Sequence, residues 1–578
     1  MSGRMVTLSG WVHKRRDHGG LIFIDLRDRF GLTQLIFDPK TAPGTHNAAT
    51  FLRLEWVISI KGRVRPRIKG QENPNLPTGA VEVEVLELHI LSEASALPIV
   101  ISDSHTEISE DVALKYRYLT LRKEKITQNL VKRHKTMMAT RKFLDQSGFL
   151  EISTPILAKA TPEGARDYLV PSRLYHGHFY ALPQSPQIFK QLLMIGGLDR
   201  YFQIAPCFRD EDLRADRQPE FHQIDIELSF GTPDETIAIT EELLKAIFSE
   251  VLGCSIQPPF NRMSHLNALE HYGTDRPDLR FNMPLVRLTD VALRSNFSLF
   301  KEAVEGGSIV KAITLKNGAK LSRKEIEKLT EFVKPFGLKG LAFMKHTNEG
   351  FSSSIVKFFD QELLLEIENR MKSEVDDLIL FASAAEPIVN QSLDHLRRKL
   401  ALDFNLYDPS DLAFVWVVDF PLFAYDEDDK RLVSEHHPFT APHPDDLHLL
   451  DSDPLKARSL AYDIVLNGYE IGGGSQRIHS PETQTKIFQI LKLSAEKINE
   501  KFGFFTEALS YGTPPHGGIA LGVDRLVMIL SNTENIREVI AFPKTAKAND
   551  LMMACPSSVE SRQLTDLGLQ LLESKELS

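Results

Sequence analysis

Cysteine is scarce in this sequence: its 578 residues contain only Cys207, Cys254 and Cys555. Three cysteines so far apart provide neither a disulfide framework nor a Cys-x-x-Cys metal site, so we expect all three to be reduced and inert. Long hydrophobic runs are also missing, since the longest, such as residues 414–423, fall far short of the roughly 20 residues of a membrane span. The N-terminus shows no apolar signal core, and we expect a cytoplasmic protein.

Three common catalytic signatures are absent as well. The sequence has no Walker-type Gly-Lys-Ser/Thr loop, no His-Glu-x-x-His and no Gly-x-Ser-x-Gly, which disfavours P-loop phosphate binding, zinc hydrolysis and serine acyl transfer. The net charge of −10 argues weakly against wholesale nucleic-acid coating but says nothing about a local basic face. With 42% hydrophobic and 25% charged residues the composition is that of a soluble globular protein, and its length predicts about three to five domains.

Residues 6–91 contain five short strand-like runs broken by Gly, Pro and Asn, which predicts a small β-barrel. In 21–28 the apolar residues alternate with Phe23 and with polar groups, so the ring lies on the outer face. Several cations surround it: Lys14, Arg15, Arg16, Arg29, Lys61, Arg63, Arg65, Arg67 and Lys69. Such a face binds single-stranded nucleic acid, and the alternative is a solvated face with one spare aromatic.

The rest of the chain predicts a multidomain α+β protein. We expect a barrel domain at 1–95, a linker at 96–112, the first part of a catalytic domain at 113–279, an inserted α+β domain at 280–406, and the second part of the catalytic domain with a C-terminal extension at 407–578. The insertion is indicated by strand and helix signals that alternate without a cluster of catalytic residue types. Pro155 interrupts a short strand, which places that strand at a sheet margin or a subunit interface.

Residues 207–227 hold two strand-like pieces separated by a run of charges. Strand alternation gathers Phe221, Asp225 and Glu227 on one polar face with Arg209. A face of this kind can clamp a phosphate, stack a flat base and hold a cationic group. The alternative is a salt-bridged hairpin in water, which would not need a ring at Phe221.

Two glycine-containing segments add further candidates. Arg525 follows an apolar strand in the first turn of a helix, where a cation opposes the helix dipole and would attract a phosphate, or else pairs with a carboxylate. Asp463 and Glu470 are hard oxygen ligands suited to Mg²⁺, and Arg477 suits a carboxylate. Glu470 and Arg477 can serve one site only if the intervening glycines form a bulge or kink.

Several further residues are individually weak candidates, because each of them alone is more often on the surface or structural. They are Glu163, Ser185, Gln187, Lys190, His436 and His437.

Taken together, these stretches resemble the bacterial type of aspartyl-tRNA synthetase, a class II enzyme, over essentially the whole chain. Residues 143–157 look like class II motif 1, 207–227 like motif 2 and 518–530 like motif 3. The resemblance implies an N-terminal OB-fold barrel, an antiparallel catalytic sheet, a GAD-like inserted domain and a homodimer. It also implies an aspartate-tRNA ligase that uses ATP and Mg²⁺ to activate L-aspartate and transfers it to tRNA(Asp).

The resemblance assigns roles residue by residue. The catalytic residues would be Arg209, Arg525 and Glu470. ATP would meet Arg209, Asp210, Glu211, Gln218, Phe221, Glu470, Gly522, Val523, Asp524 and Arg525. Aspartate would meet Glu163, Ser185, Gln187, Lys190, Arg209, Asp225, His436 and Arg477. The metal would be held by Asp463 and Glu470, and the anticodon by Arg16, Phe23, Gln34 and Glu82.

Two loop residues, His18 and Gly70, resemble the non-discriminating forms that aspartylate both tRNA(Asp) and tRNA(Asn). Family members usually carry a further short segment before the first strand, so we expect a misassigned start codon or a missing part of the RNA contact. The alternatives are a strictly discriminating enzyme, a tRNA-independent adenylate-forming paralogue and an inactive RNA-binding paralogue. The barrel with Phe23, together with Arg209 and Arg525, disfavours the last two.

Overall fold

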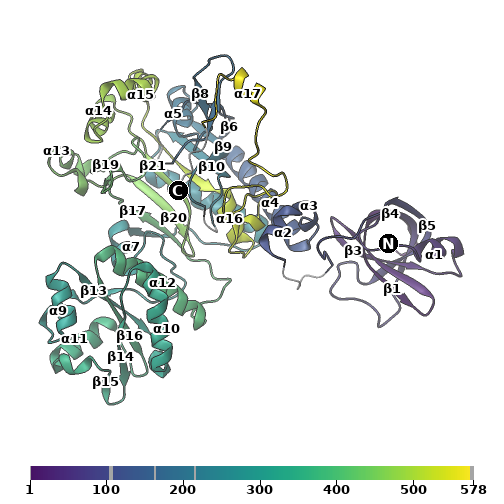
Figure 1. Cartoon of the computed structure of the whole chain (residues 1–578), viewed down its shortest axis with the longest axis horizontal. Helices are drawn as coiled ribbons and strands as arrows, with labels where there is room; N and C mark the ends of the chain where they lie inside the picture. Colours follow the sequence, from purple (N-terminus) through teal and green to yellow (C-terminus); the bar gives the residue numbers. More distant parts are fainter. Residues whose placement is uncertain (1, 103–107, 162–164, 214–215, 573–578) are drawn as a thin grey trace. The chain divides into compact units, whose positions relative to one another are not determined.

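The computed structural model describes residues 2–102, 108–161, 165–213 and 216–572 of the chain (Figure 1). The chain forms two compact units. The first comprises 1–134, 212–219 and 527–564, and the second comprises 135–211, 220–526 and 565–578. Among the described residues, every helix is too short or too polar to cross a membrane.

The first unit contains a closed five-stranded barrel with the strand order β1-β2-β3-β5-β4. Its elements are β1 (Met5–His18), β2 (Leu21–Asp28), β3 (Gly31–Phe37), α1 (Pro43–Ala49), β4 (Val57–Pro66) and β5 (Val81–Ser92). Alternate residues point inward, so Val12, Ile24 and Leu35 are fully buried. The barrel predicted from the alternation is therefore confirmed.

Short helices and a C-terminal segment complete the first unit. They are α2 (Glu110–Lys115), α3 (Arg117–Thr120), the start of α4 (Glu124–Gln146) and η6 (Ile536–Glu538). The buried Arg117 guanidinium donates to the carbonyl oxygens of Arg537, Ile540 and Ala541 at 2.7, 2.8 and 2.9 Å. Burial lowers the pKa of Arg117 to about 10. These bonds fasten the C-terminal segment to the helices.

The second unit is built on an eight-stranded sheet with the order β11-β17-β20-β21-β22-β10-β9-β6. The strands are β6 (Leu150–Glu151), β9 (Arg200–Phe208), β10 (Glu220–Ser229), β11 (Asn261–Ser264), β17 (Phe414–Val418), β20 (Ala461–Leu466), β21 (Tyr469–Gln476) and β22 (His516–Gly522). Only the outermost pairs, β11 with β17 and β6 with β9, are parallel. The strand before Pro155 lies at the margin, as predicted.

A register shift in the centre of this sheet provides the bulge that Glu470 and Arg477 need in order to lie on one face. Ile464 pairs with Gly472 but Val465 pairs with Glu470, which leaves Ile471 as an extra residue of β21. The extra residue restores Glu470 and Arg477 to one face. Glycine is required beside it, since a Cβ on Gly473 would lie 2.6 Å from Asp463 Oδ1.

The chain contains further helices and two hairpins outside the large sheet. They are β7 (Leu169–Pro171), β8 (Phe179–Ala181), α5 (Gln187–Ile195), α6 (Pro233–Leu252), α7 (His265–Tyr272), β18 (Phe423–Asp426), β19 (Arg431–Ser434), α13 (Leu449–Ser452), α14 (Pro481–Ile490), α15 (Ala495–Leu509), α16 (Val523–Leu530) and α17 (Ser561–Asp566). Helix α6 begins with a capping box at Thr232 and Glu235 and ends at Gly253 in the left-handed region, so its sequence specifies both ends.

A separate five-stranded sheet, β12-β13-β16-β14-β15, falls within the segment predicted to be an insertion. Its elements are β12 (Val286–Arg287), α8 (Thr289–Arg294), α9 (Ser298–Glu305), β13 (Ile309–Leu315), α10 (Arg323–Val333), β14 (Ala342–Thr347), β15 (Gly350–Ser352), α11 (Gln361–Met371), β16 (Leu378–Ala384) and α12 (Glu386–Asp403). Ile313 packs with residues of α10 and α12, whereas Ala312 packs with residues of α9 and α11. Helices therefore cover both faces.

Candidate functional site

A pocket of about 310 Å³ lies on the eight-stranded sheet. Its walls come from segments far apart in the chain: the loop before α5 and α5 itself, the segment after β9, strands β10, β20, β21 and β22, and the loop after β19. Of the residues predicted for the site, it gathers Ser185, Gln187, Lys190, Arg209, Glu211, Asp225, His436, Asp463, Glu470 and Arg477. Arg525, Phe221 and Asp524 are not among the residues that line it, so the structure brings together part of the predicted set.

Two cations and two carboxylates form the buried floor of this pocket. Lys190 Nζ lies 3.1 Å from Asp225 Oδ1 and 3.4 Å from Glu227 Oε2. Arg477 binds Glu227 through two nitrogens, at 2.9 and 3.1 Å. These side chains are at most 2% exposed. Because buried charges of this kind are costly to leave unpaired, the floor is rigidly held.

Glu227 was absent from the predicted site residues, although alternation placed it on the same face as Asp225. Burial raises the pKa of Glu227, but Arg477 and Lys190 outweigh it and hold that pKa below its ordinary value. Burial also raises the pKa of Asp225, and there the effect of Lys190 is too small to reverse it. Asp225 is therefore the less compensated carboxylate of the two.

His437 supports Arg477 from the other side. Arg477 Nη1 lies 3.0 Å from His437 Nε2, and a neutral imidazole accepts this hydrogen bond. Burial, followed by the charge of Arg477, holds the pKa of His437 well below its ordinary value. Neutral His437 and charged Glu227 together fix the plane of the guanidinium.

Several buried polar atoms of the pocket have no hydrogen-bond partner among the residues that the structure describes. They are Gln187 Nε2, Arg209 Nε, Asp225 Oδ2 and His436 Nδ1. Buried polar groups are nearly always satisfied, so such a concentration in one pocket indicates a site for a polar ligand. The Arg209 guanidinium also lies over the Phe221 ring, 5.2 Å from its centroid.

Asp463, Glu470 and His436 form the acidic side of the pocket. Burial raises the pKa of Asp463 to about 6; His436 partly offsets this and the charge of Glu470 adds to it. The described residues hold no group of three or more metal-ligating side chains. Two carboxylates fit Mg²⁺, which keeps several waters and takes phosphate oxygens. Arg525 donates to the Glu470 carbonyl and lies 3.9 Å from its carboxylate.

The other predicted ATP residues have diverse surroundings. Asp524 Oδ2 accepts a hydrogen bond from the His222 amide at 2.8 Å, Val523 is fully buried and Gly522 ends β22. Asp210 forms an isolated bridge with Arg166. In the first unit, Gln218 exchanges two hydrogen bonds with the Lys544 backbone, at 2.8 and 3.0 Å. Glu163 lies outside the described residues.

The predicted anticodon residues share one face of the barrel. Arg16 pairs with Phe23 across β1 and β2, and Arg16 Nη2 donates to Asp25 Oδ1 at 2.7 Å. Gln34 Nε2 donates to Glu82 Oε2 at 2.8 Å. Phe23 is half-buried. His18 is exposed at the end of β1, and Gly70 is exposed in a turn. This face is a connected polar network beside a ring.

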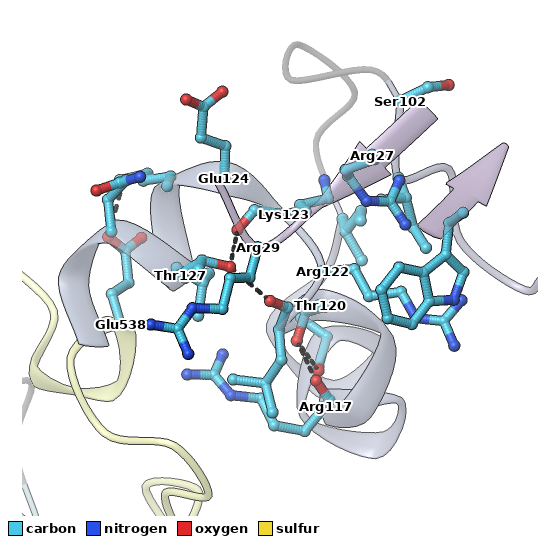
Figure 2. Close-up of a pocket in the computed structure, with 18 of the residues that line it drawn as sticks. Arg27, Arg29, Ser102, Arg117, Thr120, Arg122, Lys123, Glu124, Thr127 and Glu538 are labelled. Carbon is cyan, nitrogen blue, oxygen red and sulfur yellow. Dashed lines mark hydrogen bonds and ion pairs between the residues drawn. The ribbon is translucent and has the colours of Figure 1, made fainter. Parts of the chain in front are cut away.

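A larger cavity of about 1180 Å³ also lies in the first unit, and Figure 2 shows Arg27, Arg117 and Arg122 on its wall. Its arginines are already engaged. Arg27 and Arg122 both bind the Glu55 carboxylate and flank the Trp11 ring at 5.8 and 5.3 Å. These contacts hold the barrel against the segment between α3 and α4. We therefore interpret the residues around the cavity as structural contacts within the first unit.

Comparisons with known families match both parts of the chain. Residues 109–546 match the family described as tRNA synthetases class II (D, K and N), and residues 6–91 match the OB-fold nucleic acid binding domain. A relative from Protochlamydia amoebophila, named Aspartate--tRNA(Asp/Asn) ligase, is 58% identical over 99% of this chain and 95% of its own length. A relative of the same name from Chlamydia muridarum is 54% identical over 98% and 97%.

Solved structures show the same fold at low sequence identity. Asparaginyl-tRNA synthetase from Pyrococcus horikoshii in complex with asparaginyl-adenylate has a TM-score of 0.59 at 20% identity, covering 94% of this chain and 95% of that chain. Aspartyl-tRNA synthetase from Entamoeba histolytica has a TM-score of 0.57 at 19% identity, covering 94% and 89%. The predicted OB-fold and the predicted synthetase domain are both confirmed.

Proposed function

Because this chain belongs to the class II tRNA synthetases of the D, K and N group, we propose that it is an aspartate-tRNA ligase that charges both tRNA(Asp) and tRNA(Asn). The buried floor of the pocket carries this proposal. Lys190 and Arg477 would take the side-chain carboxylate of aspartate, while Asp225, whose Oδ2 has no partner among the described residues, would take the ammonium group. Glu163, Ser185, Gln187 and His436 would complete the aspartate site.

The charge of the floor explains why aspartate is preferred over asparagine. Lys190 and Arg477 balance Asp225 and Glu227, so the empty floor carries no excess charge. The ammonium group and the side-chain carboxylate of aspartate add one charge of each sign and keep that balance. Asparagine shares the ammonium and the α-carboxylate but lacks the side-chain charge, and its carboxamide would place NH₂ donors against cations that can only donate.

The reaction needs no protein nucleophile. An oxygen of the aspartate α-carboxylate attacks the α-phosphorus of ATP, the bond to the bridging oxygen breaks, and pyrophosphate leaves. The 3′-terminal ribose hydroxyl of the tRNA then attacks the carbonyl carbon of the adenylate and AMP leaves. Arg209 would neutralise the α-phosphate and Arg525 the γ-phosphate, so alignment and charge stabilisation supply the acceleration.

The nucleotide would be held beside the aspartate site. Phe221 would offer a ring for the adenine, with Glu211 near the adenosine and the segment from Gly522 to Asp524 supporting Arg525. Asp463 and Glu470 would hold Mg²⁺, whose charge when bound would offset that of the phosphates. Burial is the main reason why the pKa of Asp463 is raised, and the charge of Glu470 adds to it; a bound cation would offset both effects.

The barrel would supply the tRNA contact. Phe23 would stack an anticodon base, Gln34 and Glu82 would read base edges, and Arg16 would contact the backbone. Charging of tRNA(Asn) is supported by the names of the relatives and by the small or neutral residues at positions 18 and 70. A strictly discriminating enzyme is the second candidate, and a tRNA-independent adenylate-forming enzyme would not need the barrel.

A second copy of this chain would complete the assembly, which we propose to act in the cytoplasm. Exposed apolar side chains follow the motif 1 region, from α4 through β6 to the hairpin of β7 and β8: Met138, Leu150, Ile156, Leu157, Leu169 and Leu174. Exposed apolar surface of this kind marks protein interfaces. Sedimentation equilibrium would test this, because a monomer at micromolar concentration would contradict it.

An aminoacylation assay with two tRNAs tests the proposed function. Purified tRNA(Asp) and tRNA(Asn) transcripts are incubated with the enzyme, ATP and labelled aspartate, and separately with labelled asparagine. We expect aspartate on both tRNAs and no asparagine on either. Charging of tRNA(Asp) alone would show a discriminating enzyme. Aspartate-dependent exchange of pyrophosphate into ATP without any tRNA charging would favour the tRNA-independent reading.

A further inference from the structure

The side chain of Gln184 is 3% exposed and pairs with the backbone of a neighbouring segment. Its Oε1 accepts a hydrogen bond from the Ala165 amide at 3.0 Å. Its Nε2 donates to the Ala165 carbonyl at 2.8 Å and to Asp167 Oδ1 at 2.5 Å. The carboxamide therefore acts like an additional peptide group, and both of its ends are used.

The segment held by Gln184 forms part of the pocket wall. Ala165 lines the pocket, and so does Ser185, the neighbour of Gln184 in the chain. The segment is tied at two further points, because the Asp210 amide donates to the Arg166 carbonyl at 3.1 Å and the Leu182 amide donates to the Tyr168 carbonyl at 2.9 Å. In sequence, Ala165 comes two residues after Glu163.

We propose that Gln184 is a positioning residue for the aspartate end of the pocket, acting through Ala165 and Ser185 without touching the substrate. This inference rests on the proposed function. Its physical basis is that only a carboxamide matches three partners of different kinds here, one donor and two acceptors. Losing the donor end leaves the Ala165 carbonyl and the Asp167 carboxylate facing a group that cannot satisfy them, so the wall shifts.

Gln184→Glu is the sharpest single change. It keeps the length of the side chain and the acceptor for the Ala165 amide, but it places a carboxylate oxygen where the amide nitrogen donated. We expect KM for aspartate to rise about tenfold, because the repulsion from Asp167 displaces the wall beside the amino acid. KM for ATP should change less than about twofold. Both constants come from aspartate-dependent ATP–pyrophosphate exchange.

A second substitution tests the contact itself. Asp167→Asn supplies an amide that can donate to the new carboxylate, so the double variant Gln184→Glu/Asp167→Asn regains one of the lost hydrogen bonds. We expect it to recover most of the loss in KM for aspartate, although it carries two substitutions. Additive losses would instead show that the effect of Gln184→Glu does not act through its contact with Asp167.

Asn467 provides a matched control. It is 8% exposed, its Oδ1 accepts from the Ala413 amide at 2.9 Å and its Nδ2 donates to the Asp411 carbonyl at 2.8 Å. Asn467 is not among the residues that line the pocket. Asn467→Asp should therefore lower the melting temperature, as Gln184→Glu does, while both KM values stay within about twofold of wild type.

The outcomes separate this inference from the proposed function. An active wild type whose Gln184→Glu variant raises both KM values equally, or is not rescued by Asp167→Asn, would overturn the positioning role alone. A wild type without aspartate-dependent exchange would overturn the proposed function instead. If Gln184→Glu fails to fold, the same KM values are measured for the double variant and for Gln184→Asn. Gln184→Asn keeps both ends of the amide on a shorter side chain.

Discussion

The barrel face and the pocket of the eight-stranded sheet both gather charged side chains on neighbouring strands, but they satisfy them differently. On the barrel, Arg65 binds both Glu82 and Glu84, and its side chain is 34% exposed. In the pocket, Lys190 is 1% exposed and its neighbour Asp225 keeps an oxygen without a partner among the described residues. The charged groups of the barrel face are paired with each other. The pocket, in contrast, keeps a buried carboxylate oxygen that a ligand can bind.

This difference suits two kinds of ligand. A small charged substrate must be captured by groups already fixed in place, since reorganising them would cost affinity. A single-stranded RNA brings many weak contacts, so the barrel can exchange internal pairs for contacts with bases and phosphates. We therefore expect substitutions in the pocket to have large effects on folding and chemistry, and substitutions on the barrel to have moderate effects that are confined to tRNA.

The largest expected effect is on stability, from Lys190→Met compared with Arg65→Met. Removing Lys190 leaves two buried carboxylates with one fewer cation, and breaking a buried pair costs about 3–5 kcal/mol. Removing Arg65, whose side chain is 34% exposed, should cost less, because Gln34 still donates to the Glu82 carboxylate. Urea unfolding measures both free energies. If both substitutions lower the free energy of unfolding equally, the charges of the pocket would not be buried in the way that the structure shows.

Arg209→Ala should have the next largest effect. Loss of the group that neutralises the α-phosphate should lower the rate of aspartate-dependent ATP–pyrophosphate exchange by about a hundredfold to a thousandfold. Binding of tRNA, measured by filter retention, should be unchanged, because the barrel is intact. Near-normal exchange would refute the role assigned to Arg209.

Strand alternation in the sequence indicated part of this region, and the remaining site residues were assigned only through the resemblance. Alternation placed Phe221, Asp225 and Glu227 on one face, and it made the joint use of Glu470 and Arg477 conditional on a bulge. The structure has that bulge at Ile471. Alternation also predicted the barrel core around Ile24.

What the sequence could not predict depends on register between distant segments. Glu227 and Arg477 are 250 positions apart, so no local pattern reveals that they pair. Gln184 lies in the loop before α5, where no periodicity indicates the direction of a side chain. Gln218 was assigned near the adenosine, and its amide instead exchanges hydrogen bonds with Lys544, so its role in ATP binding stays a prediction.

Phe23→Ala tests the barrel side of the comparison at a smaller scale. Loss of one stacked base costs about 1–3 kcal/mol, so kcat/KM for tRNA(Asp) should fall about fivefold to a hundredfold. Exchange of pyrophosphate in the absence of tRNA should be unaffected. An equal fall in exchange would show that the substitution perturbs the catalytic unit, and the separation of roles between the two regions would then be wrong.

The smallest expected effect is on pH dependence, and it involves one histidine from each region. Burial, followed by the charge of Arg27, lowers the pKa of His13, and burial with Arg477 lowers that of His437 further. Folding therefore disfavours the protonated form of both, while an unfolded histidine takes up a proton below about pH 6.5. Their stabilising contribution is therefore complete above that pH and is lost as the pH falls, by at most about 1.4 kcal/mol per unit for each histidine.

Comparison of variants isolates this effect from the other titrating groups. Between pH 7 and pH 5.5, His437→Asn should lose less stability than the wild type, because the variant has no proton to gain there on unfolding. His13→Asn should show the same reduction to a smaller extent, since its pKa is less strongly lowered. Thermal unfolding at a series of pH values measures the slopes. A larger reduction for His13→Asn than for His437→Asn would contradict this prediction. It would mean that the pKa of the barrel histidine is lowered more than that of the pocket histidine.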